Sequence, residues 1–497
     1  MGRLGDLDDL LARADSLAAA WGDAAADRTT AGQQRAILRL FGVHGLDREG
    51  RPLAGEVVDR YVGPDPRRLA GGIALPFAMA AVEYDLGAQE LALEVTTGGV
   101  DLALEAELLA EPDRRAVAEA EADRLARAAL ERIDANRTAR RELLGLLGDA
   151  TRPWVGTAIE EPSLAHALDE ALDDVHAGVD LLRIDVPVGR ELADRLADAG
   201  MEVEPWRPGP RRAPDGLDAS ELPGIDVPAG SQRGIASLRR AVDEAAAERR
   251  SYVRLATATP ALAAPEQAVV AAFERVDLVA ADAVTEIVAA RVDPDRALAD
   301  HVFGHAILRR AGALVLVGPG PLVVAPDLET GMPSDAATRS GRALALQLVG
   351  VALARRNGLE PQRVLVGALP DWTVEEAAPT GLAAAELAVR RELFPDHPFA
   401  FAEPALDEAH AATWIALLGA LLPEAGAVGA IIRRPGPGLA RRALATRAAG
   451  VVGAGLAGAR DRQSLRGAAA EFAAATIRAA RHTLDRLVAD GWRAVLG

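Results

Sequence analysis

Short apolar runs recur along the chain between residues 154 and 434, and each is bounded by Gly, Pro or charged residues. Runs of this length that are rich in β-branched and aliphatic residues are typical of buried strands. Eight of them can be counted. They cover residues 154–159, 180–187, 251–258, 276–283, 312–320, 363–370, 399–404 and 427–434.

Helical patterns lie between these runs, at residues 163–177, 232–249, 264–274, 337–357, 374–393 and 407–422. Strands that alternate with helices predict an α/β fold with a parallel sheet. Eight such strands predict a (β/α)8 barrel of the TIM type, whose chemistry lies on the loops after the strands. A doubly wound sheet stays open as the alternative, because residues 201–206 could form another strand and the Pro/Gly-rich stretch 205–230 interrupts the alternation.

The flanks of this region have a helical pattern. Amphipathic segments precede it at residues 5–20, 31–42, 72–95 and 112–146, and a long helix is expected after it at residues 463–493. We therefore expect three parts: an N-terminal helical region over 1–150, the barrel over 151–436 and C-terminal helices over 437–497.

Composition narrows the classes of partner. The chain has 497 residues and a formal net charge of −18, which repels nucleic acid and anionic membranes. Its first residues read as an acidic amphipathic helix and not as a signal peptide, and its longest apolar stretch, 343–354, is too short to span a bilayer. These features predict a cytoplasmic protein with neither a nucleic-acid nor a membrane partner.

Two residue types are absent, and each absence excludes chemistry. The sequence has no Cys, which excludes thiolate nucleophiles and iron–sulfur clusters. It also has no Lys, so it cannot hold pyridoxal phosphate as a Schiff base by itself. If that cofactor is used, another chain must supply the lysine.

Three motif-like stretches have plainer explanations. GAGLAG at 453–458 follows a helical segment and lacks the strand that a dinucleotide site needs, so a turn between helices is expected. HVFGH at 301–305 has two His one helical turn apart but no general-base Glu, which favours ordinary helix histidines and no metal site. DVHAG at 174–178 departs from the cobalamin-binding D-x-H-x-x-G pattern, and we interpret it as a helix end that leads into a strand.

Polar residues gather where the predicted strands end. An Arg within an apolar strand is costly to bury unless it meets an anion, so arginines there point either to a carboxylate or phosphate ligand or to internal salt bridges that close the barrel. We expect the strand ends that carry Arg183, Asp282, Asp371 and Glu403 to converge on one face of the barrel. The full set is Glu160, Glu161, Asp185, Asp282, Asp371 and Glu403, with Arg183, Arg254 and Arg433.

Several blocks of the sequence follow one another in a recognisable order. The first is RTTAGQQRAILRLFGVHGLD at 28–47, and the others are 152–159, 177–184, 251–268, 274–288, 357–372 and 391–398. Over about residues 28–440 these blocks resemble, in order, the α subunit of the adenosylcobalamin- and pyridoxal-phosphate-dependent D-lysine 5,6-aminomutase family.

The resemblance implies a barrel subunit that shares adenosylcobalamin and pyridoxal phosphate with a β-type subunit. That partner would carry the cobalamin His and the Schiff-base Lys, and the reaction would be a radical 1,2-amino shift on lysine or a related diamino acid. Carried over residue by residue, Asp282 would bind the substrate amine. The cofactor-binding positions would be Arg183, Ser231, Gln232 and Arg254.

The chain also departs from the family pattern. Ala368 stands where the family has a His, Leu406 where it has a substrate-facing Lys, and the aromatic residue near the cofactor is lost from 257–266. Two alternatives therefore stay open: a non-catalytic paralogue that acts as scaffold or regulator of such a complex, and an unrelated barrel hydrolase that uses strand-end carboxylates with a metal.

Overall fold

The computed structural model describes residues 7–47, 51–63, 65–150, 154, 156–159, 163–184, 218, 227, 229–258, 263–318, 335–367, 386, 388–400, 431–432 and 464–496. Its centre is a sheet of eight parallel strands in the order β7-β6-β5-β4-β3-β2-β1-β8. The strands are β1 (Gly156–Ile159), β2 (Leu181–Ile184), β3 (Arg254–Ala258), β4 (Leu278–Ala280), β5 (Leu314–Val317), β6 (Val364–Gly367), β7 (Phe399–Ala400) and β8 (Ile431–Ile432).

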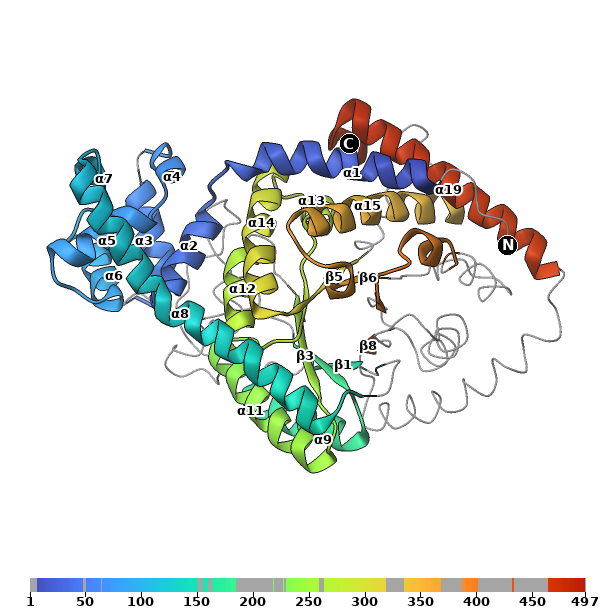
Figure 1. Ribbon diagram of the computed structural model, residues 1–497, viewed down its shortest axis with the longest axis horizontal. Coiled ribbons are helices and arrows are strands. Elements are labelled where there is room, and N and C mark those ends of the chain that lie inside the picture. Colours follow the sequence, from blue (N-terminus) through green and yellow to red (C-terminus); the bar gives the residue numbers. More distant parts are fainter. Residues whose placement is uncertain are drawn as a thin grey trace, which may run out of the picture.

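Each strand lies within one of the eight predicted runs, and each pairs in parallel with its neighbour in this order. The sheet curls so that β8, the last strand, pairs with β1, the first. The prediction of an α/β fold with a TIM-type barrel is confirmed, and the doubly wound alternative is wrong, because helices lie outside a curled sheet whose first and last strands are neighbours (Figure 1).

Side chains alternate between the inside of the barrel and the surrounding helices. Leu181, Leu278 and Leu316 pack together on the inner face. Their neighbours Leu182 and Val279 pack outward against helices. This two-residue period is what a strand dictates, and it explains why the runs are apolar throughout: both faces are buried.

Helices after the strands cover the outer face of the sheet. They are α9 (Leu164–Ala177), α11 (Gln232–Arg249), α12 (Ala264–Phe273), α13 (Ala283–Ala290), α14 (Pro294–Ala311) and α15 (Ala336–Arg356). The predicted ranges agree closely for α9, α11, α12 and α15. Both α13 and α14 were missed by the sequence pattern, whereas the ranges 374–393 and 407–422 lie largely or wholly outside the described residues.

The N-terminal helices form two groups. Helix α1 (Leu7–Ala26) lies beside α15 and α19 (Ser464–Asp490) and shares their apolar core (Figure 1). The second group has a core of its own. It consists of α2 (Ala31–Leu40), α3 (Leu53–Val62), α4 (Arg68–Gly71), α5 (Ala74–Glu83), α6 (Ala88–Thr97), α7 (Leu102–Leu108) and the start of α8 (Pro112–Leu147).

Helix α8 joins this second group to the barrel. Its 36 residues span about 54 Å at 1.5 Å per residue, and its C-terminal half lies against α12 and α14 (Figure 1). The last short helix, α20 (Arg493–Leu496), follows α19 at the end of the chain. The divisions at 150/151 and 436/437 stay predictions.

Candidate functional site

The carboxyl end of β4 turns directly into helix α13. Asp282 is the N-cap of that helix: its Oδ1 accepts from the Val284 amide at 3.0 Å and its Oδ2 from the Thr285 hydroxyl at 2.8 Å. A carboxylate at this position satisfies amides that the first helical turn leaves free. The sequence put Asp282 at the end of a strand, and the structure makes it the start of the next helix.

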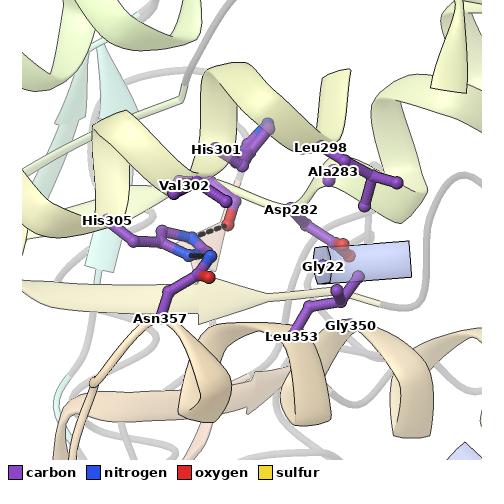
Figure 2. Close-up of a pocket in the computed structure, with 11 residues that line it drawn as sticks. Gly22, Asp282, Ala283, Leu298, His301, Val302, His305, Gly350, Leu353 and Asn357 are labelled. Carbon is purple, nitrogen blue, oxygen red and sulfur yellow. Dashed lines mark hydrogen bonds between the residues drawn. The ribbon is translucent and has the colours of Figure 1, made fainter. Parts of the chain in front are cut away.

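The carboxylate of Asp282 points away from the barrel axis, into the helical layer. It faces α15, where a Cβ added at Gly350 would lie 3.0 Å from Oδ1 and 2.8 Å from Val317, a residue on the outer face of β5. Figure 2 shows Asp282 and Gly350 on opposite sides of one small cavity. The chain avoids a side chain at 350 because one would fill the space that the carboxylate occupies.

This cavity has a volume of about 10 Å³, roughly what one water molecule needs. A cavity of this volume is far too small for an amino acid or a cofactor. It lies between α1, α13, α14 and α15. Its lining residues are Gly22, Ala281, Asp282, Ala283, Leu298, His301, Val302, His305, Gly350, Leu353 and Asn357.

Both histidines of the HVFGH stretch are buried on α14, and their pKa values are shifted in opposite directions. His305 Nε2 donates to the Ala281 carbonyl at 3.1 Å, and its Nδ1 accepts from Asn357 at 2.9 Å (Figure 2). Burial, with His301 nearby, lowers the pKa of His305 to about 3. His305 is therefore a neutral residue that fixes the end of β4 by holding the carbonyl before Asp282.

His301 has an acidic environment. Its Nε2 lies 3.1 Å from Glu286 Oε1. Burial alone would lower the pKa of His301, but Glu286, Asp282 and Asp300 outweigh it and the pKa is raised. Among the described residues no group of three or more His, Asp and Glu side chains could hold a metal ion. Both histidines contact neighbouring residues from a helix, as ordinary helix histidines do.

Burial also perturbs Asp282 itself. Desolvation raises its pKa to about 6, only partly opposed by the Thr285 hydroxyl and by His301. The group can therefore change its charge near neutral pH, which is unusual for an N-cap.

Arg254 lies at the other end of the barrel. It is the first residue of β3, and the register that pairs Ala256 with Leu278 separates it from Asp282 by about 20 Å, at roughly 3.3 Å per residue. Its guanidinium stacks 3.5 Å above the Trp154 ring and donates to Asp149 at 2.6 Å. The anion that Arg254 meets is thus an internal carboxylate, as the salt-bridge alternative expected.

A buried ion network surrounds Asp277 at this same end. Its carboxylate accepts from Arg140 at 2.8 Å, from Arg239 at 3.1 Å and from the Tyr252 hydroxyl at 2.8 Å. Burial alone would raise the pKa of Asp277, but Arg140, Arg239 and Arg254 lower it. The network ties α8 and α11 to the amino ends of the strands, which indicates a role in stability.

Arg183 is the candidate that the strand pattern directs into the barrel. It is two residues from the inward-facing Leu181, and its register partners on the neighbouring strands are Ala158 and Ala256. Arg183 therefore lies on the inner face between two small side chains, and its role in cofactor binding stays a prediction.

Ser231 and Gln232 begin helix α11. Ser231 is its N-cap, with Oγ accepting from the Gly234 amide at 3.1 Å. Gln232 donates to Glu274 at 2.9 Å and accepts from Arg39 at 3.0 Å. Ser231 thus caps its own helix, whereas Gln232 links α11 to the end of α12 and to α2.

Several predicted positions lie outside the described residues: Glu160, Glu161, Asp185, Asp371, Glu403, Arg433, Ala368, Leu406 and the GAGLAG stretch at 453–458. The convergence expected for Asp371 and Glu403 therefore stays a prediction. DVHAG, in contrast, is a helix end followed by a strand, as predicted: α9 ends at Ala177, and Gly178 takes the left-handed conformation before β2.

Sequence reasoning missed the buried acids around His301. Glu286 follows Asp282 by four residues, and Asp300 adjoins His301. Recognising α13 and α14 as helices would have placed these acids on facing surfaces, since residues four apart share a helix face. The signal was present, but the helices were not assigned.

Comparison with known proteins identifies the family. The family model for the TIM-barrel domain of the α subunit of D-lysine 5,6-aminomutase matches residues 7–199 and 228–408, well over half of the chain. The chain belongs to this family.

Two curated relatives agree with it. The lysine 5,6-aminomutase α subunit of Fusobacterium nucleatum is 25% identical over 374 residues, which cover 75% of this chain and 65% of the relative. That of Acetoanaerobium sticklandii is 24% identical over 377 residues, which cover 76% and 66%. The match thus spans just under two thirds of the length of each relative.

Solved structures show only distant likenesses. Dihydropteroate synthase from Burkholderia cenocepacia has a TM-score of 0.34 at 14% identity, covering 62% of this chain and 94% of that one. The enzyme from Anaplasma phagocytophilum has a TM-score of 0.37 at 9% identity, covering 61% and 99%. Likenesses at this level support no argument about this chain.

In the described part of the chain, no helix is both long and apolar enough to span a membrane.

Proposed function

We propose that this chain is the α-type barrel subunit of an aminomutase that uses adenosylcobalamin and pyridoxal phosphate and acts on lysine or a related diamino acid. The observation that carries the proposal is the family match, which extends over the N-terminal helices and most of the barrel. In this proposal a β-type subunit provides the lysine that the chain lacks and the histidine that ligates cobalamin. Bound together, the two groups supply radical chemistry and a ring that carries the migrating amine.

The described residues fit a pyridoxal phosphate site only in part. Arg183 lies on the inner face beside small partners, where it can pair with a phosphate or carboxylate. Arg254 binds Asp149 at the opposite end, and Gln232 is bound to Arg39 and Glu274. These contacts do not assemble an anion cradle, so we assign no step of the reaction to Arg254, Ser231 or Gln232.

Asp282 is the second candidate to weigh against the geometry. Its carboxylate is engaged by Val284 and Thr285 and faces the helical layer. The role in substrate binding that the resemblance implies stays a prediction, and the structure supports an N-cap role beside it.

The alternative function, a non-catalytic scaffold or regulator in such a complex, is favoured by one observation: Asp282, Ser231, Gln232 and Arg254 make side-chain contacts within the chain. One experiment separates the two. The chain is co-expressed with a candidate β-type subunit, the complex is isolated by size exclusion, and lysine turnover is assayed with both cofactors added.

A complex that converts the amino acid, and loses that activity in Arg183→Ala while still assembling, supports the proposed enzyme. A complex that assembles but has no turnover on any diamino acid supports the scaffold. Failure to associate with the β-type chain would count against both.

A further inference from the structure

The side chain of Gln347 joins the ends of two neighbouring strands. Gln347 lies in the middle of α15 and is fully buried, and α15 packs over the outer face of β5 and β6 (Figure 1). Its Nε2 donates to the Val317 carbonyl at 3.3 Å and to the Gly367 carbonyl. Val317 is the last residue of β5 and Gly367 the last residue of β6, so one amide group holds both strands where they end.

The close approach of α15 to the sheet lets a glutamine reach both carbonyls. Gly350 follows Gln347 by three residues and so lies on the same face of the helix. A Cβ added at Gly350 would lie 2.8 Å from the Val317 side chain. The register pairs Val317 with Val366, the residue before Gly367, so the two carbonyls are near enough for one amide.

A third segment fixes the orientation of the Gln347 amide. Arg390 Nε donates to Gln347 Oε1 at 2.9 Å, so the amide oxygen faces Arg390 and the NH2 group faces the carbonyls. Both hydrogens of that NH2 group then have an acceptor. Arg390 is fully buried and belongs to the helical segment 388–393, which leads to β7.

The charge of Arg390 is balanced within its own segment. Its Nη1 donates to Glu386, which is also buried and lies four residues earlier. We call Gln347, Glu386 and Arg390 the strand-end network; it is neutral as a whole and shielded from water. Under these conditions a hydrogen bond is strong, and a buried carbonyl that loses its donor is costly.

The place of the strand-end network bears on function. In barrels of this type the reacting groups are carried by the loops that follow the strands. The chain leaves β5 after Val317 and β6 after Gly367, at the carboxyl end of the sheet. A reacting group needs a fixed backbone, because a small displacement lowers the rate steeply.

We propose that Gln347 is a positioning residue for the reactive face of the barrel: its amide holds the carboxyl ends of β5 and β6 in place, and Arg390 holds the amide. Gln347 acts through the backbone that it fixes and is not itself a catalytic residue. Its effect on turnover rests on the proposed function, whereas its effect on the strand ends does not.

The test is amide hydrogen exchange of the full chain in Gln347→Met, which keeps the approximate length of the side chain but removes the donor. Loss of one hydrogen bond to a buried carbonyl changes a local opening equilibrium about tenfold. Exchange in β5 and β6 should therefore rise about tenfold or more relative to the wild type. Exchange in β2 and β3, on the other side of β4, should change less than about threefold.

The matched control is Gln267→Met on α12. Gln267 is also fully buried, but the acceptor of its Nε2 is the Thr257 hydroxyl, at 3.1 Å. In this control, exchange of β5 and β6 should stay within about threefold of the wild type. If Gln347→Met gives an equal rise in all four strands, or no rise in β5 and β6, the proposal is overturned, because Gln347 would then be an ordinary core residue.

A second variant covers the case in which Gln347→Met does not fold. Gln347→Glu keeps the size of the side chain and its contact with Arg390, but an ionised carboxylate has no hydrogen to donate to the two carbonyls. The same rise in β5 and β6 is expected at pH 8. Unchanged exchange in those strands would overturn the proposal.

Turnover of the assembled complex tests the functional step. With a candidate β-type subunit and both cofactors, Gln347→Met should lower kcat about tenfold or more and change KM less than about threefold, because binding contacts are kept while the reacting geometry is lost. Gln267→Met should match the wild type. Equal kcat in Gln347→Met and the wild type would overturn the positioning role. A wild-type complex without turnover would count against the proposed aminomutase instead, and the exchange pattern would still decide whether Gln347 fixes the strand ends.

Discussion

Asp282→Asn tests whether the carboxyl at the end of β4 is a buried group that the fold tolerates or a charge that the fold needs. Asn caps helices about as well as Asp, so the bond from the Val284 amide is kept. What changes is the cost of ionisation. Burial raises the pKa of Asp282 from 3.8 to about 6. At about 1.4 kcal/mol for each tenfold change, ionising the buried carboxyl costs about 3 kcal/mol.

The sign follows from linkage. Because the folded pKa lies above the unfolded one, protonated Asp282 stabilises the fold fully below about pH 4, and this contribution is lost as pH rises through about 6. About half of the loss falls above pH 5. Relative to the wild type, Asp282→Asn should therefore gain about 1 to 2 kcal/mol of unfolding free energy between pH 5 and pH 8.

Urea unfolding of the two proteins at both pH values measures this gain. Asp293→Asn replaces an exposed N-cap on α14 and should show a change of at most about 0.5 kcal/mol. If Asp282→Asn shows no gain, or is the less stable protein at pH 8, then a cation stabilises the carboxylate and the argument from burial is refuted.

The same variant bears on substrate binding. Because the carboxylate faces the helical layer, calorimetric titration of diamino acids into the assembled complex should give equal affinities for wild type and Asp282→Asn. Binding weaker by roughly 1.5 to 3 kcal/mol, the worth of a charge-assisted hydrogen bond, would restore the amine-binding role that the resemblance implies.

Three further outcomes are expected. Arg140→Ala leaves Asp277 buried with one cation fewer and should lower the unfolding free energy by about 3 kcal/mol or more in urea titrations; a loss below about 1 kcal/mol would contradict the network. Gly350→Ala puts a methyl group 2.8 Å from Val317 and should cost about 1 to 3 kcal/mol by the same assay, whereas no loss would show that α15 can shift. His305 should stay neutral with its proton on Nε2 from pH 5 to 8, seen as constant ¹⁵N shifts, and titration in that range would disprove its assignment.

The sequence by itself determined the fold class. All eight strands lie within predicted runs, because a strand buried on both faces must be apolar at every position and that signal is local. The predicted bounds of four helices around the barrel agree closely with the structure for the same reason, because cap residues and helical periodicity are local features of the sequence. Helices α13 and α14 were not predicted. Helix α13 has only eight residues, which is too short for a clear periodic pattern, and three residues separate it from α14.

The family resemblance could also be recognised from the sequence, and the family match confirms it. The roles of the individual residues could not be recognised in this way. Strand order places Arg183 and Arg254 on neighbouring strands, yet Arg183 has alanine partners on the inner face whereas Arg254 closes the amino end with Asp149. A sequence gives the position of a residue along a strand, but not the partner that the rest of the chain brings to it.

Tertiary structure alone decided the surroundings of Asp282. Its pattern fits a strand-end carboxyl directed into the barrel, but β4 ends two residues earlier and the side chain turns outward to cap α13 against Gly350. The pKa of Asp282 depends on its burial among helices far apart in the chain and on His301 of α14. Desolvation and charge coupling act through space, so only the packing of those helices could decide them.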